Sequence, residues 1–87
     1  MHRVLIAPLL HSYTGGRAET EARGATLAEV LSDLEAHHPG IRFRIIDEQD
    51  RIRPHMWLFV GGRLARDLTA PIAPGDEIQV IGALSGG

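Results

Sequence analysis

The 87-residue sequence contains no cysteine, so no side chain is available for a disulfide, a thiolate metal ligand or a Cys nucleophile. It also contains no lysine: all nine basic residues are arginines, and they are scattered along the chain. A nucleic-acid-binding surface needs clustered basic residues, so this pattern and the net charge of −2 argue against a nucleic-acid partner. No apolar run is long enough to cross a bilayer, and the N-terminus lacks the features of a signal peptide. We therefore expect a cytoplasmic protein with no membrane partner.

The spacing of apolar residues predicts one main helix. The spacing i, i+3, i+4, i+7 is occupied by Leu27, Val30, Leu31 and Leu34. Thr26 and Glu29 have the pattern of a capping box, which satisfies unpaired backbone N–H groups at a helix start. Pro39-Gly40 then predicts the end of the helix, because the residue before proline disfavours the α region.

The segments on either side of this helix are typical of short strands and turns. Arg3–Leu10 predicts a first strand, with Pro8 at an edge position or a bulge. Gly15-Gly16 predicts a tight turn, and Arg17–Ala22 predicts a returning strand, which together make a hairpin. The remaining predictions are a connector with one short ordered turn (41–54), a strand (55–60), a turn at Gly61-Gly62, a segment that can pair back (63–68), a turn (74–76) and a last strand (77–83).

The predicted order is ββαβ(β)β, which makes the chain an α+β protein of one domain. Right-handed crossovers leave few arrangements for these elements, and the one we expect is a mixed sheet with the helix packed on one face. This is the β-grasp, or ubiquitin-like, architecture. We expect it to occupy residues 1–83, with a flexible Gly-Gly tail at 84–87.

Strand parity predicts an apolar patch on the other face of the sheet. Side chains alternate between the two faces along a strand. If Met56, Leu58 and Val60 point toward the helix, Trp57 and Phe59 therefore point away from it. The same parity places Leu5 and Ile81 beside them. Exposed apolar patches of this kind mark partner-binding sites, and the alternative is that a loop or a dimer covers these residues.

Several stretches together resemble the MoaD/ThiS family of ubiquitin-like sulfur carriers. They are "LLHSYTGG", "ATLAEVLSDLEAHHPG", "LFVGG", "PIAPGDEIQVIGALSGG" and the terminal Gly86-Gly87. The resemblance covers essentially the whole chain and is closest to the subgroup with "SYTGG" in the first turn, some members of which serve cysteine biosynthesis. The sequence departs from the family at Gly61, where Asn is common, and at His11, where Arg is usual.

The resemblance implies that the chain is not an enzyme but a carrier on which enzymes act. A C-terminal carboxylate is a poor electrophile, so an E1-like adenylyltransferase/sulfurtransferase would activate Gly87 with ATP and convert it to a thiocarboxylate. A sulfur-accepting synthase would then take the sulfur, and the carrier itself would bind no cofactor. Gly86 lets the backbone enter narrow active sites, and Leu84 and Ser85 form the neck of the tail.

Three questions stay open at this point. The terminal glycines can instead be an untethered chain end, and the domain a ubiquitin-like binding module or protein modifier with no sulfur chemistry. The acceptor can be a pterin, a thiazole or an activated amino acid, and the chain can be the small subunit of a synthase complex. The arginines at 42, 44, 51 and 53 can form a solvated face or dock a partner.

The five histidines are dispersed, so we expect no metal site. His37 and His38 are adjacent at the predicted helix end and point in different directions. We expect them to interact with the unpaired carbonyl groups there.

Overall fold

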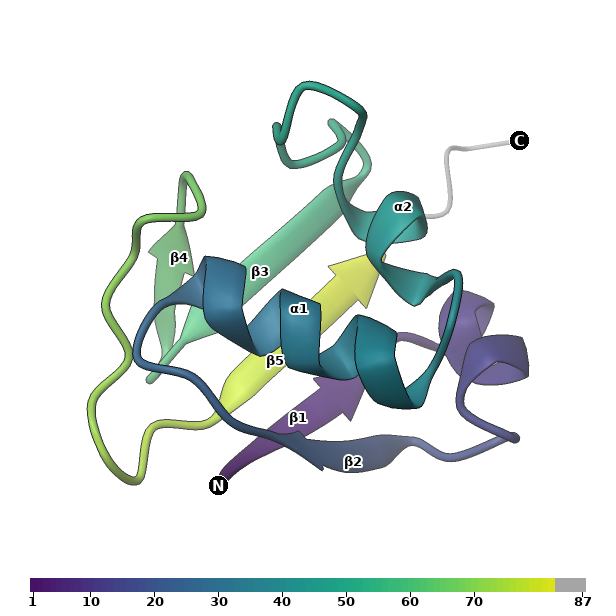
Figure 1. The fold of residues 1–87 in the computed structure, drawn as a ribbon, viewed down its shortest axis with the longest axis horizontal. Coiled ribbons are helices and arrows are strands. Elements are labelled where there is room, and N and C mark those ends of the chain that lie inside the picture. Colours follow the sequence, from purple (N-terminus) through teal and green to yellow (C-terminus); the bar gives the residue numbers. More distant parts are fainter. Residues whose placement is uncertain (83–87) are drawn as a thin grey trace.

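A computed structural model describes residues 1–82 of the chain, and residues 83–87 lie outside the described part. A five-stranded sheet is covered on one face by helices (Figure 1). The strands are β1 (His2–Ile6), β2 (Glu19–Ala22), β3 (Met56–Val60), β4 (Arg63–Ala65) and β5 (Ile78–Gly82). The helices are α1 (Leu27–His37), α2 (Ile41–Ile45) and the 3-10 helix η1 (Pro8–Tyr13). No described helix has both the length and the apolar character needed to cross a membrane.

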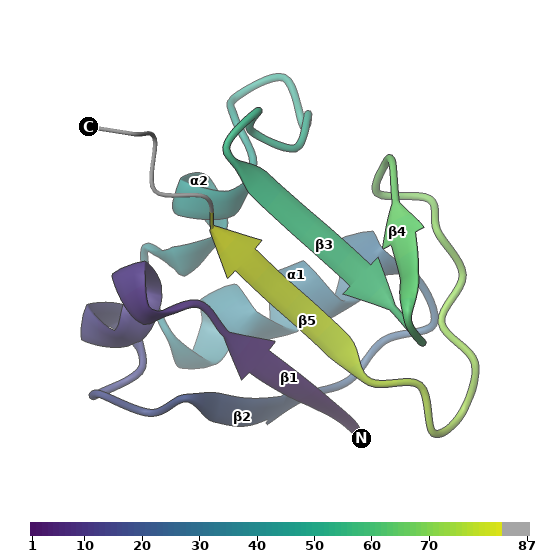
Figure 2. The same cartoon turned by 180° about the vertical axis from the view of Figure 1, so that it is seen from behind.

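The strand order is β2-β1-β5-β3-β4, so the last strand lies in the middle of the sheet. β1 and β5 run parallel, and the other neighbouring pairs are antiparallel. Figure 2 shows the opposite face, with α1 behind the sheet and no helix in front of the central strands. This arrangement confirms the predicted α+β fold, a β-grasp with one main helix on one face of a mixed sheet.

The core lies between α1 and the covered face of the sheet. All four residues of the predicted helical stripe are buried: Leu27, Val30, Leu31 and Leu34. At the start of α1 the backbone N–H of Glu29 donates to Thr26 Oγ1 over 3.3 Å. The Glu29 carboxylate accepts from the N–H of Ala25 over 2.9 Å, one residue earlier than in the predicted capping box. The helix therefore begins where the sequence predicts.

The prediction of a first strand that reaches Leu10 is wrong. β1 ends at Ile6, and Pro8 is neither at a strand edge nor in a bulge but in the first turn of η1. The fixed φ angle and missing N–H of proline suit the first turn of a helix, where the N–H would have no partner. The antiparallel pairing of β1 with β2 confirms the hairpin, and η1 lengthens its connection.

The second half of the chain follows the predicted order closely. The connector at 41–54 has an ordered turn at 48–50, and it also contains α2, a helix that the sequence did not predict. Gly61 and Gly62 have φ angles of 56° and 83°, which is the backbone of a tight hairpin turn, and β4 pairs back on β3. β5 begins one residue later than predicted, and Ala83, the last residue of the predicted strand, lies outside the described residues.

Candidate functional site

The end of β5 at Gly82, called the exit, is the last described point before the predicted tail. Gly82, its last described residue, is the cross-strand partner of Met56 at the start of β3. The tail residues to which the sequence assigns the chemistry lie outside the described part: Leu84, Ser85, Gly86 and Gly87. Their roles stay predictions, and the structure describes the strand end and the sheet surface that precede them.

Gly82 itself is a site residue that the sequence did not single out. A Cβ atom at this position would lie 2.2 Å from Leu9 Cδ2, so the absence of a side chain lets Leu9 of η1 pack against the strand end. Leu9 is 40% exposed and forms one border of this exit. The available signal was a glycine inside a strand where no turn follows, which often marks such a close approach.

The structure brings the four residues of the predicted patch together on the uncovered face. Trp57 and Ile81 are cross-strand partners and are 54% and 42% exposed, respectively. Leu5 and Phe59 are half-buried and lie on either side of Gln79, the cross-strand partner of both. The patch therefore consists of two cross-strand rows. Trp57 and Ile81 form one row, and the other has the polar Gln79 between Leu5 and Phe59. Its role in partner binding stays a prediction.

A shallow groove of about 250 Å³ runs beside this patch along β1 and β5. Leu5 and Ile81 belong to both the patch and the groove, and Pro8 and Gly82 close its end near the exit. The apolar surface thus continues from the sheet face to Gly82, the last described residue.

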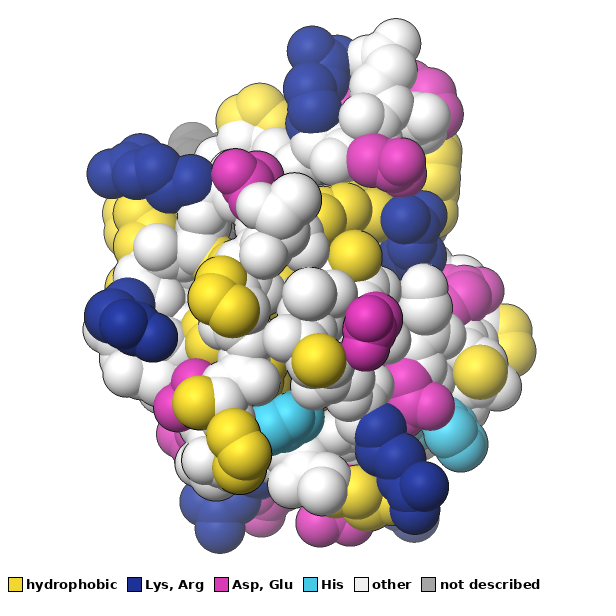
Figure 3. Space-filling view, turned by 60° about the vertical axis from the view of Figure 1, so that its left-hand side comes forward, with side chains coloured by type: hydrophobic (Ala, Val, Ile, Leu, Met, Phe, Trp, Pro, Cys, Tyr) yellow, Lys and Arg dark blue, Asp and Glu magenta, His cyan; other side chains and the backbone are white. Residues whose placement is uncertain are grey.

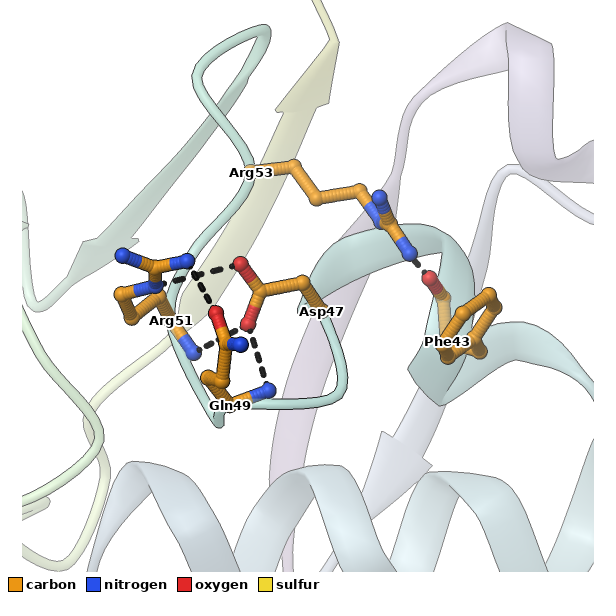
Figure 4. A network of polar contacts seen from close by, with 5 residues as sticks. All are labelled: Phe43, Asp47, Gln49, Arg51 and Arg53. Carbon is orange, nitrogen blue, oxygen red and sulfur yellow. Dashed lines mark hydrogen bonds and ion pairs between the residues drawn. The ribbon is translucent and has the colours of Figure 1, made fainter.

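The turn after α2 is organised by Asp47. Its carboxylate accepts hydrogen bonds from the backbone N–H groups of Gln49 and Arg51 over 2.9 and 3.0 Å, and from Arg51 Nε over 3.3 Å (Figure 4). The backbone N–H of Arg51, followed by that of Gln49 and the charge of Arg51, lowers the pKa of Asp47. Arg42 pairs with Asp50 across the same turn over 3.2 Å. Arg42 and Arg51 are thus paired with the acidic residues of this turn, which fits the solvated alternative for these two arginines.

The five histidines do not cluster. The ring nitrogens of His2 are 3.1 and 3.0 Å from the carbonyl oxygens of Asp76 and Gly24, which holds this buried residue between two loops. His37 Nδ1 is 2.9 Å from the carbonyl oxygen of Asp33, as expected for a helix-end histidine. His38 Nε2 lies 3.3 Å from Thr20 Oγ1 on β2 instead. Within residues 1–82, no three His, Asp or Glu side chains are arranged to hold a metal ion.

Charges of both signs are interspersed on the face shown in Figure 3. Positive side chains there alternate with acidic ones and form no continuous stripe. A nucleic-acid backbone would need such a stripe.

Comparison with known proteins gives consistent matches over nearly the whole chain. The model of the ThiS family matches residues 4–87. The sulfur carrier protein CysO of Mycobacterium tuberculosis (strain H37Rv) is 35% identical over 89 aligned residues, which cover 97% of this chain and 96% of CysO.

Solved structures show the same likeness. A chain of the Amycolatopsis orientalis BexX/CysO complex superposes with a TM-score of 0.91 at 30% identity, and all of both chains is covered. The crystal structure of Mycobacterium tuberculosis CysO gives 0.90 at 30% identity, covering 97% of this chain and 100% of CysO. SAMP1 from Haloferax volcanii gives 0.77 at 25% identity, covering 99% of this chain and 98% of SAMP1.

Proposed function

The chain belongs to the ThiS family, and from this membership we propose that it is a sulfur carrier protein on which partner enzymes act through the carboxylate of Gly87. The observation that carries the proposal is the 35% identity to the sulfur carrier CysO over almost the full length of both chains. The domain is then a cosubstrate that presents its own C-terminus, and the partner enzymes supply the catalytic groups.

The proposed chemistry has two steps. An E1-like adenylyltransferase first joins the Gly87 carboxylate to the α-phosphate of ATP and releases pyrophosphate, because a free carboxylate resists nucleophilic attack. Sulfide (HS⁻) from the donor then attacks the acyl carbon and displaces AMP, and the product is the thiocarboxylate. In this scheme ATP binds to the activating enzyme and the carrier holds no cofactor.

The position of β5 supports this use of the C-terminus. The strand is central: residues 78–80 pair with both β1 and β3, and the last two residues, Ile81 and Gly82, stay paired with β3. Five residues follow Gly82 in the sequence, and five extended residues span at most about 17 Å. That reach is enough to enter the active site of an enzyme docked on the domain, while the sheet stays outside.

We assign the carrier to the cysteine-biosynthesis type, because the "SYTGG" turn and the CysO relatives agree on that subgroup. The sulfur-accepting synthase would then hold an activated amino acid. In Amycolatopsis orientalis, CysO is found in a complex with BexX, which supports direct docking of such carriers on a partner protein. A modifier function without sulfur chemistry is the alternative. It rests on the likeness to SAMP1, a small archaeal modifier protein, at the lower identity of 25%.

Intact-mass measurement tests the proposal. Incubation with the activating enzyme of the same organism, ATP and a sulfide donor should add about 16 Da at the C-terminus, the mass of exchanging O for S. A reaction without ATP and a variant lacking Gly87 are the matched controls and should show no gain. An unchanged mass of the full chain with the cognate enzyme would reject the carrier function in favour of a binding module or modifier.

A further inference from the structure

Four arginines in the 42–53 segment divide into two pairs with different environments. Arg42 and Arg51 are neutralised by ion pairs to Asp50 and Asp47, over 3.2 and 3.3 Å. Arg44 and Arg53 form no ion pair within residues 1–82 and lie against aromatic rings instead. The charges of the second pair are therefore uncompensated in the described part of the chain.

Both uncompensated arginines are fixed in orientation. The Arg53 guanidinium carbon is 4.6 Å from the centre of the Phe43 ring, and Arg53 Nε donates to the Phe43 carbonyl over 2.8 Å. The Arg44 guanidinium carbon is 5.7 Å from the centre of the Tyr13 ring, and Arg44 Nε donates to the Tyr13 hydroxyl. In Figure 4, Arg53 extends to Phe43 on α2, whereas Arg51 turns onto Asp47 and Gln49.

The same contacts leave the binding ends of both side chains available. Each arginine uses Nε internally, and the two terminal NH₂ groups of each have no hydrogen-bond partner among residues 1–82. Stacking on a ring immobilises the guanidinium without neutralising it, so less rotamer entropy is lost when a ligand binds. The preferred ligand of such a planar fork is a carboxylate, which it can bind through two parallel hydrogen bonds.

Both arginines are connected to segments that contact β3 or β5 near Gly82. The Arg53 carbonyl accepts from the backbone N–H of Met56 over 2.9 Å, and Met56 is the cross-strand partner of Gly82. Tyr13, which holds Arg44, ends the same 3-10 helix whose Leu9 packs against Gly82. A protein that receives the C-terminus in its active site must therefore approach the elements around Gly82.

We propose that Arg44 and Arg53 are preorganised docking points for carboxylate side chains on the protein that receives the C-terminus. The inference rests on the proposed carrier function for the identity of that protein, here the activating enzyme. Charge favours a protein surface over a nucleic acid, because two fixed cations on a chain of net charge −2 match a pair of carboxylates. The two arginines would orient the domain on the partner while the apolar patch supplies contact area.

Two double variants that remove equal charge from the same segment provide the test. Arg44→Gln/Arg53→Gln removes the stacked pair, and Arg42→Gln/Arg51→Gln removes the paired arginines and lowers the net charge equally. Binding of each to the activating enzyme of the same organism is measured without ATP, at low and high salt. We expect the first variant to raise Kd about tenfold or more and to weaken its salt dependence. The second should stay within about twofold of the unchanged chain.

Equal affinity of the Arg44/Arg53 variant and the unchanged chain would overturn the inference, as would an equal loss in the control variant. So would the absence of any binding to the enzyme. A shift of the Arg44 and Arg53 Nε–Hε NMR signals by single-stranded DNA, but not by the enzyme, would also overturn it. The proposed function can be rejected independently of the docking. If the unchanged chain binds through these arginines but gains no sulfur, the docking inference stands and the carrier function is rejected.

Discussion

Leu58 and Phe59 are neighbours on β3 with opposite environments, and the difference decides how each residue serves the molecule. Leu58 is fully buried in the core cluster that also contains the apolar stripe of α1, and it is the cross-strand partner of Val80 on β5. Phe59 is half-buried on the uncovered face, next to Leu64 on β4. One residue belongs to the core and the other to the predicted partner-binding surface.

Substituting aspartate at each position should separate these roles. Phe59→Asp should leave the thermal midpoint nearly unchanged and weaken binding to the activating enzyme by about 2 kcal/mol if Phe59 is a hot spot. Leu58→Asp should unfold the domain, because it places an unpaired charge in the core. Circular dichroism melts and a binding titration give the two measurements.

The comparison has a built-in check, because both variants add the same charge one residue apart. Unfolding by Phe59→Asp would mean that this ring stabilises the domain and does not mainly serve a partner. Normal enzyme binding by a folded Phe59→Asp variant would remove Phe59 from the interface. The structure already confirms the strand parity behind this design, since Met56, Leu58 and Val60 are all buried.

At the scale of elements, Glu35 joins the two helices. Its carboxylate accepts the backbone N–H groups of Gly40 and Arg42 over 2.8 and 2.9 Å, just where α1 has ended and α2 begins. The Gly40 N–H, then the Arg42 N–H, lowers the pKa of Glu35 below its ordinary value. The ionised carboxylate thus stabilises the connection that positions α2, which carries Arg44 and the Phe43 ring on which Arg53 stacks.

The lowered pKa predicts a specific dependence of stability on pH. A carboxyl group with a lower pKa in the folded chain stabilises it fully above the unfolded pKa, and loses this effect as pH falls through the folded pKa. Glu35→Gln should therefore lower the thermal midpoint at neutral pH, and the difference should shrink below about pH 4. Melts of both chains across this range give the measurement. A constant difference down to the lowest pH would show that the charge of Glu35 contributes nothing.

Elements with strong local signals were predictable from the sequence, and elements held by distant contacts were not. α1 has four apolar residues in helical register and a cap, and the Gly61-Gly62 turn has two positive φ angles. η1 and α2 are too short to show a helical period or to be stable alone. They exist because Leu10 of η1 and Ile41 and Ile45 of α2 are buried in the shared core.

The same distinction applies to the site. Parity along single strands predicted which face each residue of the sheet patch occupies, because that rule is local. The contact of Leu9 with Gly82 and the stack of Arg44 on Tyr13 join residues far apart in the sequence. No periodicity within one element contains that information. The chemistry assigned to Gly87 came from the family resemblance, since two terminal glycines alone are compatible with an inert end.

At the scale of the whole molecule, the described core and the residues to which chemistry is assigned occupy different parts of the sequence. The core cluster runs from Val4 to Val80 and includes residues of all five strands, both α-helices and η1. Every buried apolar side chain of the described chain precedes Ile81. The core of the described part is therefore formed by residues up to Val80.

This separation predicts that deleting Gly86 and Gly87 leaves folding intact and abolishes function. The thermal midpoint should stay within a few degrees of that of the full chain, because the two glycines bring no apolar side chain to the core. The shortened chain should still bind the activating enzyme through the sheet patch and the stacked arginines, yet gain no sulfur by intact-mass measurement. Replacing both residues with alanine is the control for length, because it keeps the length of the chain and adds a Cβ at each position. This variant should recover little of the sulfur transfer if the enzyme requires close approach of the backbone. A fall of the midpoint by more than a few degrees would show that the glycines stabilise the body, and full transfer by the alanine variant would show that length alone matters.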